Sequence, residues 1–402
     1  MKIRTITCFT DPVWPLEAGE LRKLGKFIAD LRAELESAGY EVQTSRLATV
    51  PFPHLIPEGN PDSLVDLARS LEELGLAAGF DYLSLGPALP EQPHSFQAIP
   101  AALGKTDNVF FSGSLLTVRG EISLSAARAC AEIIQKASSI TRDGFTNLRF
   151  AALANVPPGA PFFPAAYHDK GGPTFALGMQ AADLAVEAVI NSKTLHECRL
   201  NLVESIEKNA SKLTRIAADP SRDQGIKFGG IDFTLAPFPE VEQSIGTAFE
   251  RLGIARVGHH GSLAAAAFLT NCLKSAKFHK AGFNGLFMPV LEDAVLAERA
   301  GEGTLTIADL LLYSTVCGTG LDTIPLPGDT TAAQIYPLLL DLAALARRLD
   351  KPLTARLMPL PGKAVGDPTN FDFPFFANSR VMRLEAHNLG GLLGEDQLLD
   401  IN

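Results

Sequence analysis

The sequence contains few cysteines and has no excess of positive charge. Its 402 residues include five cysteines, at 8, 130, 198, 272 and 317, and no two of them have Cys-x-x-Cys spacing. We therefore expect neither a disulfide framework nor a zinc ribbon. Lys and Arg together number 35 and Asp and Glu 45, which gives a formal net charge of −10. This balance excludes a chain built to coat nucleic acid, which needs a basic face.

Long hydrophobic runs are also missing. No window reaches the roughly 18 uninterrupted apolar residues of a membrane-spanning helix, so no membrane segment is expected. The first residues, MKIRTITCFTDP, alternate like a short strand and lack the long apolar core of a secretory signal. We therefore predict a cytoplasmic protein.

Several nucleotide, metal and hydrolase motifs are absent. The sequence has no GxGxxG after its first strand and no GxxxxGK[ST], HExxH or GxSxG. The main support is therefore missing for assigning the chain to the dinucleotide dehydrogenases, P-loop NTPases, zincins or α/β-hydrolases. The sequence identifies no cofactor and no metal site.

The residues that are present alternate between strand and helix patterns over most of the length. Hydrophobic residues make up 46% and charged residues 20%, which is typical of a globular chain. A strand is predicted at 2–9, a helix at 17–38, and at the other end a helix at 332–349 and a strand at 353–358. Further strands are predicted at 80–85, 108–112, 149–154, 174–178, 229–235, 256–257, 285–290 and 321–326. Further helices are predicted at 63–78, 123–136, 181–190, 195–219, 241–252, 263–273, 294–300 and 307–316.

This alternation predicts an α/β fold with mostly parallel strands. We expect one large domain over 1–402, either a barrel or a doubly wound sheet, and a split near Asn147 is the alternative. In parallel folds the loops after the carboxyl ends of strands form the ligand site, so polar residues in such loops are the candidates.

Two candidate segments carry histidines. In PFFPAAYHDKGG, His168 is a candidate general base and Lys170 a candidate ligand for an anionic group, with an ordinary polar loop as the alternative. In GHHGS, His260 precedes an Ala-rich helix whose first N–H groups can receive an anion. Two adjacent histidines without a third ligand at known spacing make a poor metal site.

Three further segments carry acids or a thiol. Asp232 lies inside an apolar strand, where a carboxylate needs a partner or a raised pKa. Glu292 and Asp293 follow a predicted strand and are either functional or helix caps. In CGTGLD, Cys317 is a candidate nucleophile beside Gly320 and Asp322, although an inert buried thiol is the safer interpretation.

Taken together and in order, five segments resemble the DUF711 (UPF0210) family: ANVPPGAPFFPAAYH, GIDFTLAPFP, RVGHHGSLAAAAFL, FMPVLEDA and CGTGLDTIPLPGD. The resemblance runs from about residue 149 to 382 and continues more loosely over the amino-terminal third. It implies a fold similar to pyruvate formate-lyase, with a ten-stranded barrel of two five-stranded parallel halves and a cysteine-bearing loop through the middle. The family's motif positions fall on His168, His260, Asp232, Glu292, Asp293, Cys317, Gly320, Leu321 and Asp322.

The chain departs from glycyl radical enzymes at one place. Those enzymes carry a glycine after a carboxyl-terminal Arg-Val-x motif, whereas residues 379–383 here read SRVMR. We therefore expect a non-radical enzyme that acts on a small anionic metabolite inside the barrel, with Cys317, His168, His260 and Asp232 as catalytic candidates. Lys170, Glu292, Asp293, Gly320 and Asp322 are the ligand-binding candidates. A metabolite-binding or regulatory protein without catalysis, and an assembly platform with structural loops, are the alternatives. A small-molecule ligand is the expected partner, nucleic acid and membrane are not expected, and a homodimer is left open.

Overall fold

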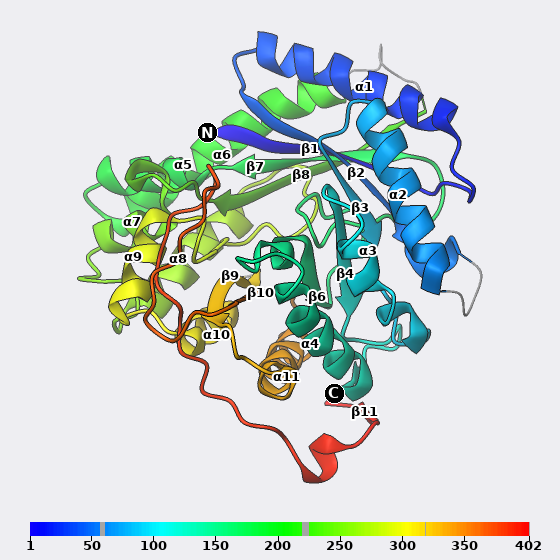
Figure 1. The fold of residues 1–402 in the computed structure, drawn as a ribbon. Helices are drawn as coiled ribbons and strands as arrows, with labels where there is room; N and C mark the ends of the chain where they lie inside the picture. Colours follow the sequence, from blue (N-terminus) through cyan, green and yellow to red (C-terminus); the bar gives the residue numbers. More distant parts are fainter. Residues whose placement is uncertain (57–60, 219–224, 318, 402) are drawn as a thin grey trace.

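The computed structural model describes residues 1–56, 61–218, 225–317 and 319–401 and confirms the α/β class (Figure 1). The strands are β1 (Lys2–Thr10), β2 (Val42–Pro51), β3 (Tyr82–Gly86), β4 (Val109–Ser114), β5 (Ile122–Ser123), β6 (Phe150–Ala154), β7 (Thr174–Gln180), β8 (Lys227–Ala236), β9 (Gly320–Pro327), β10 (Leu353–Leu360) and β11 (Leu398–Leu399). The α-helices are α1 (Ala18–Ser37), α2 (Pro61–Ala77), α3 (Ile99–Leu103), α4 (Leu124–Ser138), α5 (Ala182–Ile190), α6 (Leu195–Ala217), α7 (Ile245–Arg251), α8 (Ser262–Ser275), α9 (Ala294–Glu302), α10 (Ile307–Ser314) and α11 (Ala332–Leu349).

Nine strands of the described chain form one sheet, in the order β8-β7-β1-β2-β3-β4-β6-β10-β9. The strands from β1 to β6 in this order are parallel to one another. β7 is antiparallel to β1 and β10 is antiparallel to β6, and each carries a parallel partner at the edge. The sheet is therefore dominated by parallel pairs, as expected. The ten-stranded barrel of two five-stranded parallel halves is not confirmed, because the four remaining strands are divided between two edges.

The edge strands β8 and β9 are linked by a segment that is not itself a strand. The N–H of Leu235 in β8 donates to the carbonyl of Gly285 at 3.2 Å, and the N–H of Val290 donates to the carbonyl of Asp322 in β9 at 3.0 Å. The prediction of a strand at 285–290 is therefore wrong. Asn284 has a φ of 46°, and a proline at 289 lacks an N–H, so the segment cannot continue a regular ladder.

The inner face of the sheet is filled by the loop between β6 and β7. The Thr7 hydroxyl on β1 donates to the carbonyl of Pro161 at 2.7 Å, and the Ser84 hydroxyl on β3 donates to the carbonyl of Ala166 at 3.0 Å. The rings of Phe162 and Phe163 are buried in separate small apolar clusters there. This loop contains no cysteine.

The helices cover the outer face of the sheet (Figure 1). In α1 the buried residues Leu21, Leu24, Ile28, Leu31 and Leu35 recur every three or four positions, which is the spacing of one helix face. The chain after β10 leaves the sheet, runs towards the amino terminus and returns to end at β11, as the red trace in Figure 1 shows. Among the described helices, none is long and apolar enough to cross a membrane.

Two local predictions differ from the structure. β2 was not predicted, because its sequence VQTSRLATVP interrupts the apolar residues with polar and charged ones on both faces. The strand expected at 256–257 is a turn before α8. Strands from both sides of residue 147 share the sheet, and the single domain over 1–402 stays a prediction.

Candidate functional site

A cavity of about 400 Å³ opens at one end of the curved sheet. Its lining residues come from near the amino ends of β1, β2, β3 and β4 and from the carboxyl end of β8. This position follows from the two antiparallel junctions, which bring amino and carboxyl strand ends to the same edge. The aromatic side chains of its wall are Tyr82, Phe110, Phe145, Phe162, Phe163, Phe287, Phe373 and Phe375. The cavity is large enough for a small metabolite and has room for an apolar body.

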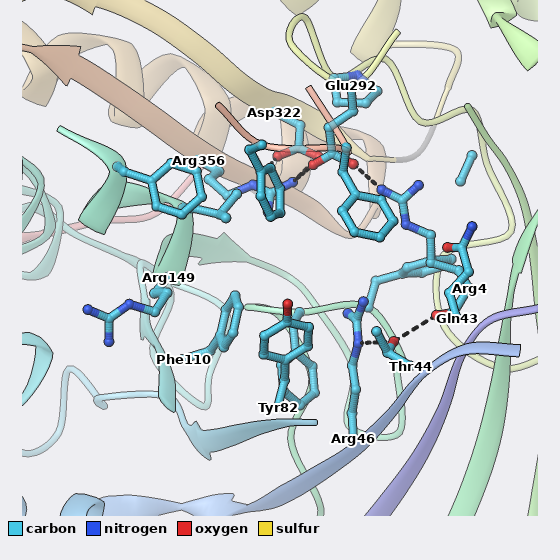
Figure 2. Close-up of a pocket in the computed structure, with 18 of the residues that line it drawn as sticks. Arg4, Gln43, Thr44, Arg46, Tyr82, Phe110, Arg149, Glu292, Asp322 and Arg356 are labelled. Atoms are coloured by element: carbon cyan, nitrogen blue, oxygen red, sulfur yellow. Dashed lines mark hydrogen bonds and ion pairs between the residues drawn. The ribbon is translucent and has the colours of Figure 1, made fainter. Parts of the chain in front are cut away.

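Two carboxylates and two guanidinium groups form a buried network on one wall (Figure 2). Arg356 on β10 donates from Nε to Asp322 Oδ1 at 2.5 Å and from Nη2 to Asp322 Oδ2 at 2.9 Å. The same Nη2 donates to Glu292 Oε1 at 2.6 Å, and Arg4 Nη2 donates to Glu292 Oε2. All four carboxylate oxygens therefore accept a hydrogen bond from an arginine.

The network shifts the pKa values of its members in opposite directions. Burial alone would raise the pKa of Glu292, but the positive charges of Arg4 and Arg356 outweigh it and lower that pKa. For Asp322, burial prevails over Arg356, and the nearby Glu292 charge adds to it, so the pKa is raised. Burial opposes the charge of Arg356, but Asp322 and Glu292 together raise its pKa. Glu292 is thus held ionised as the bridge between the two arginines.

Arg46 on β2 is the one arginine of the described pocket wall with neither a carboxylate nor a backbone carbonyl as a hydrogen-bond partner. Its Nε donates to the hydroxyl of Thr44 at 2.9 Å, and Thr44 donates in turn to the carbonyl of Arg4 at 2.7 Å. Its guanidinium lies 5.7 Å from the ring centre of Tyr82 and 5.2 Å from that of Phe163. Burial, together with the neighbouring positive charge of Arg4, lowers the pKa of Arg46 to about 9. Arg46 is therefore a fixed cation that faces the cavity (Figure 2).

Arg149, just before β6, also lines the cavity, but its guanidinium is already bound to backbone carbonyls. Its guanidinium donates to the carbonyls of Leu103 and Val109 at 2.9 and 3.2 Å, and Figure 2 shows it directed away from Arg46. It therefore supports the wall, and Arg46 is the cation available to a ligand.

The segment 371–376 covers part of the cavity. Phe373 and Phe375 belong to its lining, and the Arg4 guanidinium lies 5.8 Å from the ring centre of Phe375. The side chain of Asn378 closes this loop, because it accepts from the N–H of Phe371 at 2.8 Å and donates to the carbonyl of the same residue at 3.2 Å. The chain after β10, for which no helix or strand is predicted from the sequence, thus contributes to the site.

Of the residues predicted from sequence, Glu292 and Asp322 lie in the pocket and Asp293 does not. Asp293 is fully buried and accepts from Ser244 Oγ and from the N–H groups of Ile245 and Leu296 at 2.5, 2.7 and 2.9 Å. These contacts join the starts of α7 and α9. Asp293 therefore makes the contacts of a helix cap, which was the alternative to a functional role.

Asp232 on β8 has structural contacts of a similar kind. Its carboxylate accepts from the N–H groups of Phe283 and Asn284 at 2.7 and 2.9 Å and from the hydroxyl of Thr234 at 2.5 Å. Burial raises its pKa to about 6. A Cβ on Gly282 would stand 2.2 Å from this carboxylate, so the loop needs glycine there. Asp232 therefore organises the segment that links β8 to β9.

The predicted histidine and lysine positions lie outside the lining of the pocket. His168 is buried, and its backbone N–H donates to the carbonyl of Thr49 at 2.9 Å. The Nε2 atom of its imidazole ring has no hydrogen-bond partner in the described chain. It lies beside the carboxyl end of β2, opposite the end that holds the pocket. Lys170 and His260 are exposed. The structure does not bring these three residues together with Glu292 and Asp322.

Cys317 ends the turn after α10 and is also absent from the pocket lining. It is 1% exposed, and burial raises the pKa of its thiol. The Lys351 ammonium donates to the carbonyl of Cys317 at 2.7 Å, and so binds the turn that follows α10. Gly320 has a φ of 91°, and a Cβ there would stand 2.2 Å from the carbonyl oxygen of Thr354, so its role in β9 is steric.

Sequence reasoning missed Arg4, Arg46 and Arg356. Each lies within a strand whose other residues are mostly buried. A charged residue in a predicted apolar strand was the signal that singled out Asp232, and the same criterion applied to arginine finds Arg4 and Arg356. It does not find Arg46, because β2 was not predicted as a strand. In the described part of the chain, no group of three or more His, Cys, Asp or Glu side chains is arranged to hold a metal ion.

The fold and the pocket define a class of protein, an α/β protein with a parallel-dominated sheet and an arginine-containing, aromatic-walled cavity at one end. Comparison with known proteins then gives the family. The model of the family described as "Uncharacterised ACR (DUF711)" matches residues 1–378, and the chain belongs to this family.

The relatives are similar over nearly the whole chain. A UPF0210 protein of Pyrobaculum aerophilum is 32% identical over 95% of this chain and 83% of its own length. A UPF0210 protein of Clostridium botulinum (strain Alaska E43 / Type E3) is 30% identical over 95% and 85%, and one of Desulfovibrio desulfuricans is 29% identical over 100% and 91%. The family resemblance predicted from the sequence motifs is confirmed.

Proposed function

We propose that this protein binds a small organic anion with an apolar body in the cavity beside Arg46. The observation that carries the proposal is a guanidinium group facing an aromatic-walled cavity without a carboxylate partner among the described residues. Four arginines line the cavity, Arg4, Arg46, Arg149 and Arg356. The carboxylates that line it are three, those of Asp107, Glu292 and Asp322. One positive charge is left over, and buried charges are normally paired, so an anion is the expected counterpart.

The aromatic wall supports the second half of this proposal. Phenylalanine rings that line a cavity lose contact with water when an apolar ligand body covers them, which favours binding. A fully hydrophilic anion such as inorganic phosphate would leave these rings uncovered. The ligand class is therefore a carboxylate, phosphate or sulfonate attached to a compact apolar group.

Binding is supported more directly than catalysis. The carboxylate oxygens of Glu292 and Asp322 are all engaged by arginines, and Cys317 lies outside the pocket lining. One observation favours an enzyme as the second candidate. Asp322 also borders an inner cavity of about 10 Å³, close to the space of one water molecule. A buried carboxylate with a raised pKa beside a water molecule is suited to act as a general base.

Isothermal titration against matched probes tests the proposal. We would use 3-phenylpropionate, 4-methylpentanoate, 2-phenylethylphosphonate and 2-phenylethanesulfonate, with 3-phenylpropionamide and 3-phenylpropylamine as neutral and cationic counterparts. We expect anions to bind and their counterparts to bind at least tenfold more weakly, since a charge-assisted hydrogen bond contributes about 1.5–3 kcal/mol.

Two variants test whether the anion contacts Arg46. Arg46→Met should reduce the affinity for anions at least tenfold, whereas Arg256→Met, which removes an exposed arginine paired with Glu302 at 2.8 Å, should not. Equal binding of the amide and the anion, or equal affinities of the Arg46 and Arg256 variants, would contradict the proposal. Depletion of the bound probe, followed by mass spectrometry, distinguishes an enzyme from a binding protein.

A further inference from the structure

A row of side-chain amides runs from the pocket to the protein surface. Gln43 on β2 lines the cavity, and its Nε2 donates to Oε1 of Gln180 at 2.7 Å. Gln180, which is buried at the end of β7, donates from Nε2 to Oε1 of Gln243 at 2.8 Å. Gln243 donates from its Nε2 to the carboxylate of Glu240, which is exposed. The row therefore has a carboxylate at its outer end and the cavity at its inner end.

The carboxylate at the outer end fixes the direction of every amide in the row. An ionised carboxylate only accepts hydrogen bonds, so Gln243 must turn its NH₂ group towards Glu240 and its carbonyl towards Gln180. Gln180 then presents its own carbonyl to the NH₂ group of Gln43. The opposite direction would place a carbonyl oxygen against the carboxylate of Glu240. Gln43 is thereby left with its carbonyl oxygen, and not its NH₂ group, at the inner end.

That carbonyl oxygen has no hydrogen-bond partner. Gln43 Oε1 is buried from solvent and accepts no hydrogen bond in the described structure. Figure 2 shows the amide of Gln43 beside Arg4, on the cavity wall that also carries Arg46. A buried acceptor without a donor costs free energy, so a ligand donor that meets this oxygen when the Gln43 side chain turns further into the cavity is favoured.

We propose that the anion bound in this pocket is a hydroxy acid, whose hydroxyl group donates to Gln43 Oε1 while Arg46 binds its carboxylate. This inference rests on the proposed function and names the ligand class of that same site. A neutral hydroxyl fits better than an ammonium group, because the guanidinium groups of Arg4 and Arg46 repel a further cation. A keto group in the same place is disfavoured, because it would set one acceptor oxygen against another.

Titration with analogues that differ at one carbon tests this inference. The probes are 3-phenylpropionate, its 2-hydroxy and 3-hydroxy derivatives, phenylpyruvate and phenylalanine, with 4-methylpentanoate and its 2-hydroxy and 2-oxo derivatives as the aliphatic series. In at least one series, we expect one hydroxy acid to bind about tenfold more tightly than the parent acid, which is the effect of one good hydrogen bond. The keto and amino acids should bind no more tightly than the parent.

Two variants identify the acceptor. In Gln43→Met, which keeps the size of the side chain, the ratio of hydroxy-acid to parent-acid affinity should fall to about one. In Glu240→Gln, outside the pocket, the row loses its fixed direction and the same ratio should fall, although no ligand contact is removed. Glu242→Gln, at the exposed neighbouring acid, is the matched control and should keep the wild-type ratio.

The outcomes separate this inference from the proposed function. If anions bind in an Arg46-dependent way but hydroxyl groups give no gain in either series, the hydroxy-acid inference is overturned and the anion pocket stands. A hydroxyl gain that survives in both Gln43→Met and Glu240→Gln also overturns it. If no anion of the earlier set binds, the proposed function fails first. Should Gln43→Met not fold, the Glu240→Gln and Glu242→Gln pair still decides.

Discussion

Replacing Glu292 by Gln should change stability and ligand affinity in opposite directions. The substitution keeps the size of the side chain but removes the negative charge that bridges Arg4 and Arg356. Glu292 is 7% exposed, so water cannot replace the charge interactions that its partners Arg4 and Arg356 lose. Breaking a buried ion pair from one side costs about 3–5 kcal/mol. With an unfolding entropy of about 2.1 cal/mol/K per residue over 402 residues, this corresponds to a fall in Tm of about 4–6 °C.

The same substitution leaves the pocket with one more uncompensated positive charge. At an effective dielectric constant of about 20, a unit charge some 5–8 Å from a bound anion contributes roughly 2–3 kcal/mol before salt screening. The affinity for an anion should therefore rise at least tenfold, since tenfold corresponds to about 1.4 kcal/mol. Differential scanning calorimetry measures the first effect and isothermal titration with 3-phenylpropionate the second.

A matched surface variant controls for the loss of a carboxylate as such. Glu41→Gln removes a carboxylate that is 59% exposed and pairs with Lys2 at 3.0 Å, and should leave Tm within about 1 °C of wild type. Anion affinity should be unchanged in this control. The reasoning would be refuted if Glu292→Gln kept the wild-type Tm, or if it bound anions more weakly than wild type while remaining folded.

Three further predictions concern residues that the sequence singled out. Asp293→Ala should lower the free energy of unfolding by about 2–4 kcal/mol, because it removes the caps of two helices, and urea titration measures this. Cys317 should resist alkylation in the native protein, and Cys317→Ala should bind anions like wild type; fast native labelling detected by mass spectrometry would be contrary to its burial. Asp232 has a folded-state pKa of about 6 against 3.8 for the free group, so the folded state binds more protons between these values and stability falls as pH rises from about 4 to 6. The Tm difference between wild type and Asp232→Asn should therefore be larger at pH 4 than at pH 7, and a difference that grows with pH would contradict this.

The sequence patterns predict the elements with regular apolar spacing well and the others poorly. The helix predicted at 332–349 is α11 (Ala332–Leu349), and the strand predicted at 353–358 is most of β10. β2 was missed because Arg46 and its polar neighbours face a cavity, which breaks the alternation that identifies a half-buried strand. Strand direction was also out of reach, since the antiparallel pairing of β1 with β7 depends on how the long loop after β6 folds back.

Only part of the candidate site was predicted from the sequence. Glu292 was found because it belongs to a pair of acids after a predicted strand, and Asp322 because it follows Cys317 in the glycine-containing CGTGLD segment. His168 and Cys317 were chosen because loops after strand carboxyl ends usually carry the site, whereas here the pocket also uses strand amino ends. The arginines that hold the acids lie far away in the sequence, and the pairing of Arg4 with Glu292 spans 288 positions. Such a pairing follows from the sheet order and not from local spacing.

The central claim is that Arg46 receives the anionic group of a small ligand. A crystal structure of the protein soaked with the tightest-binding anion from the titrations tests this most directly. The account predicts that the anionic group lies within hydrogen-bond distance of the Arg46 guanidinium, with the apolar body against the rings of Phe110 and Phe163. Binding in the pocket with the anionic group away from Arg46, or binding only at exposed positions such as Lys170 and His260, would contradict it.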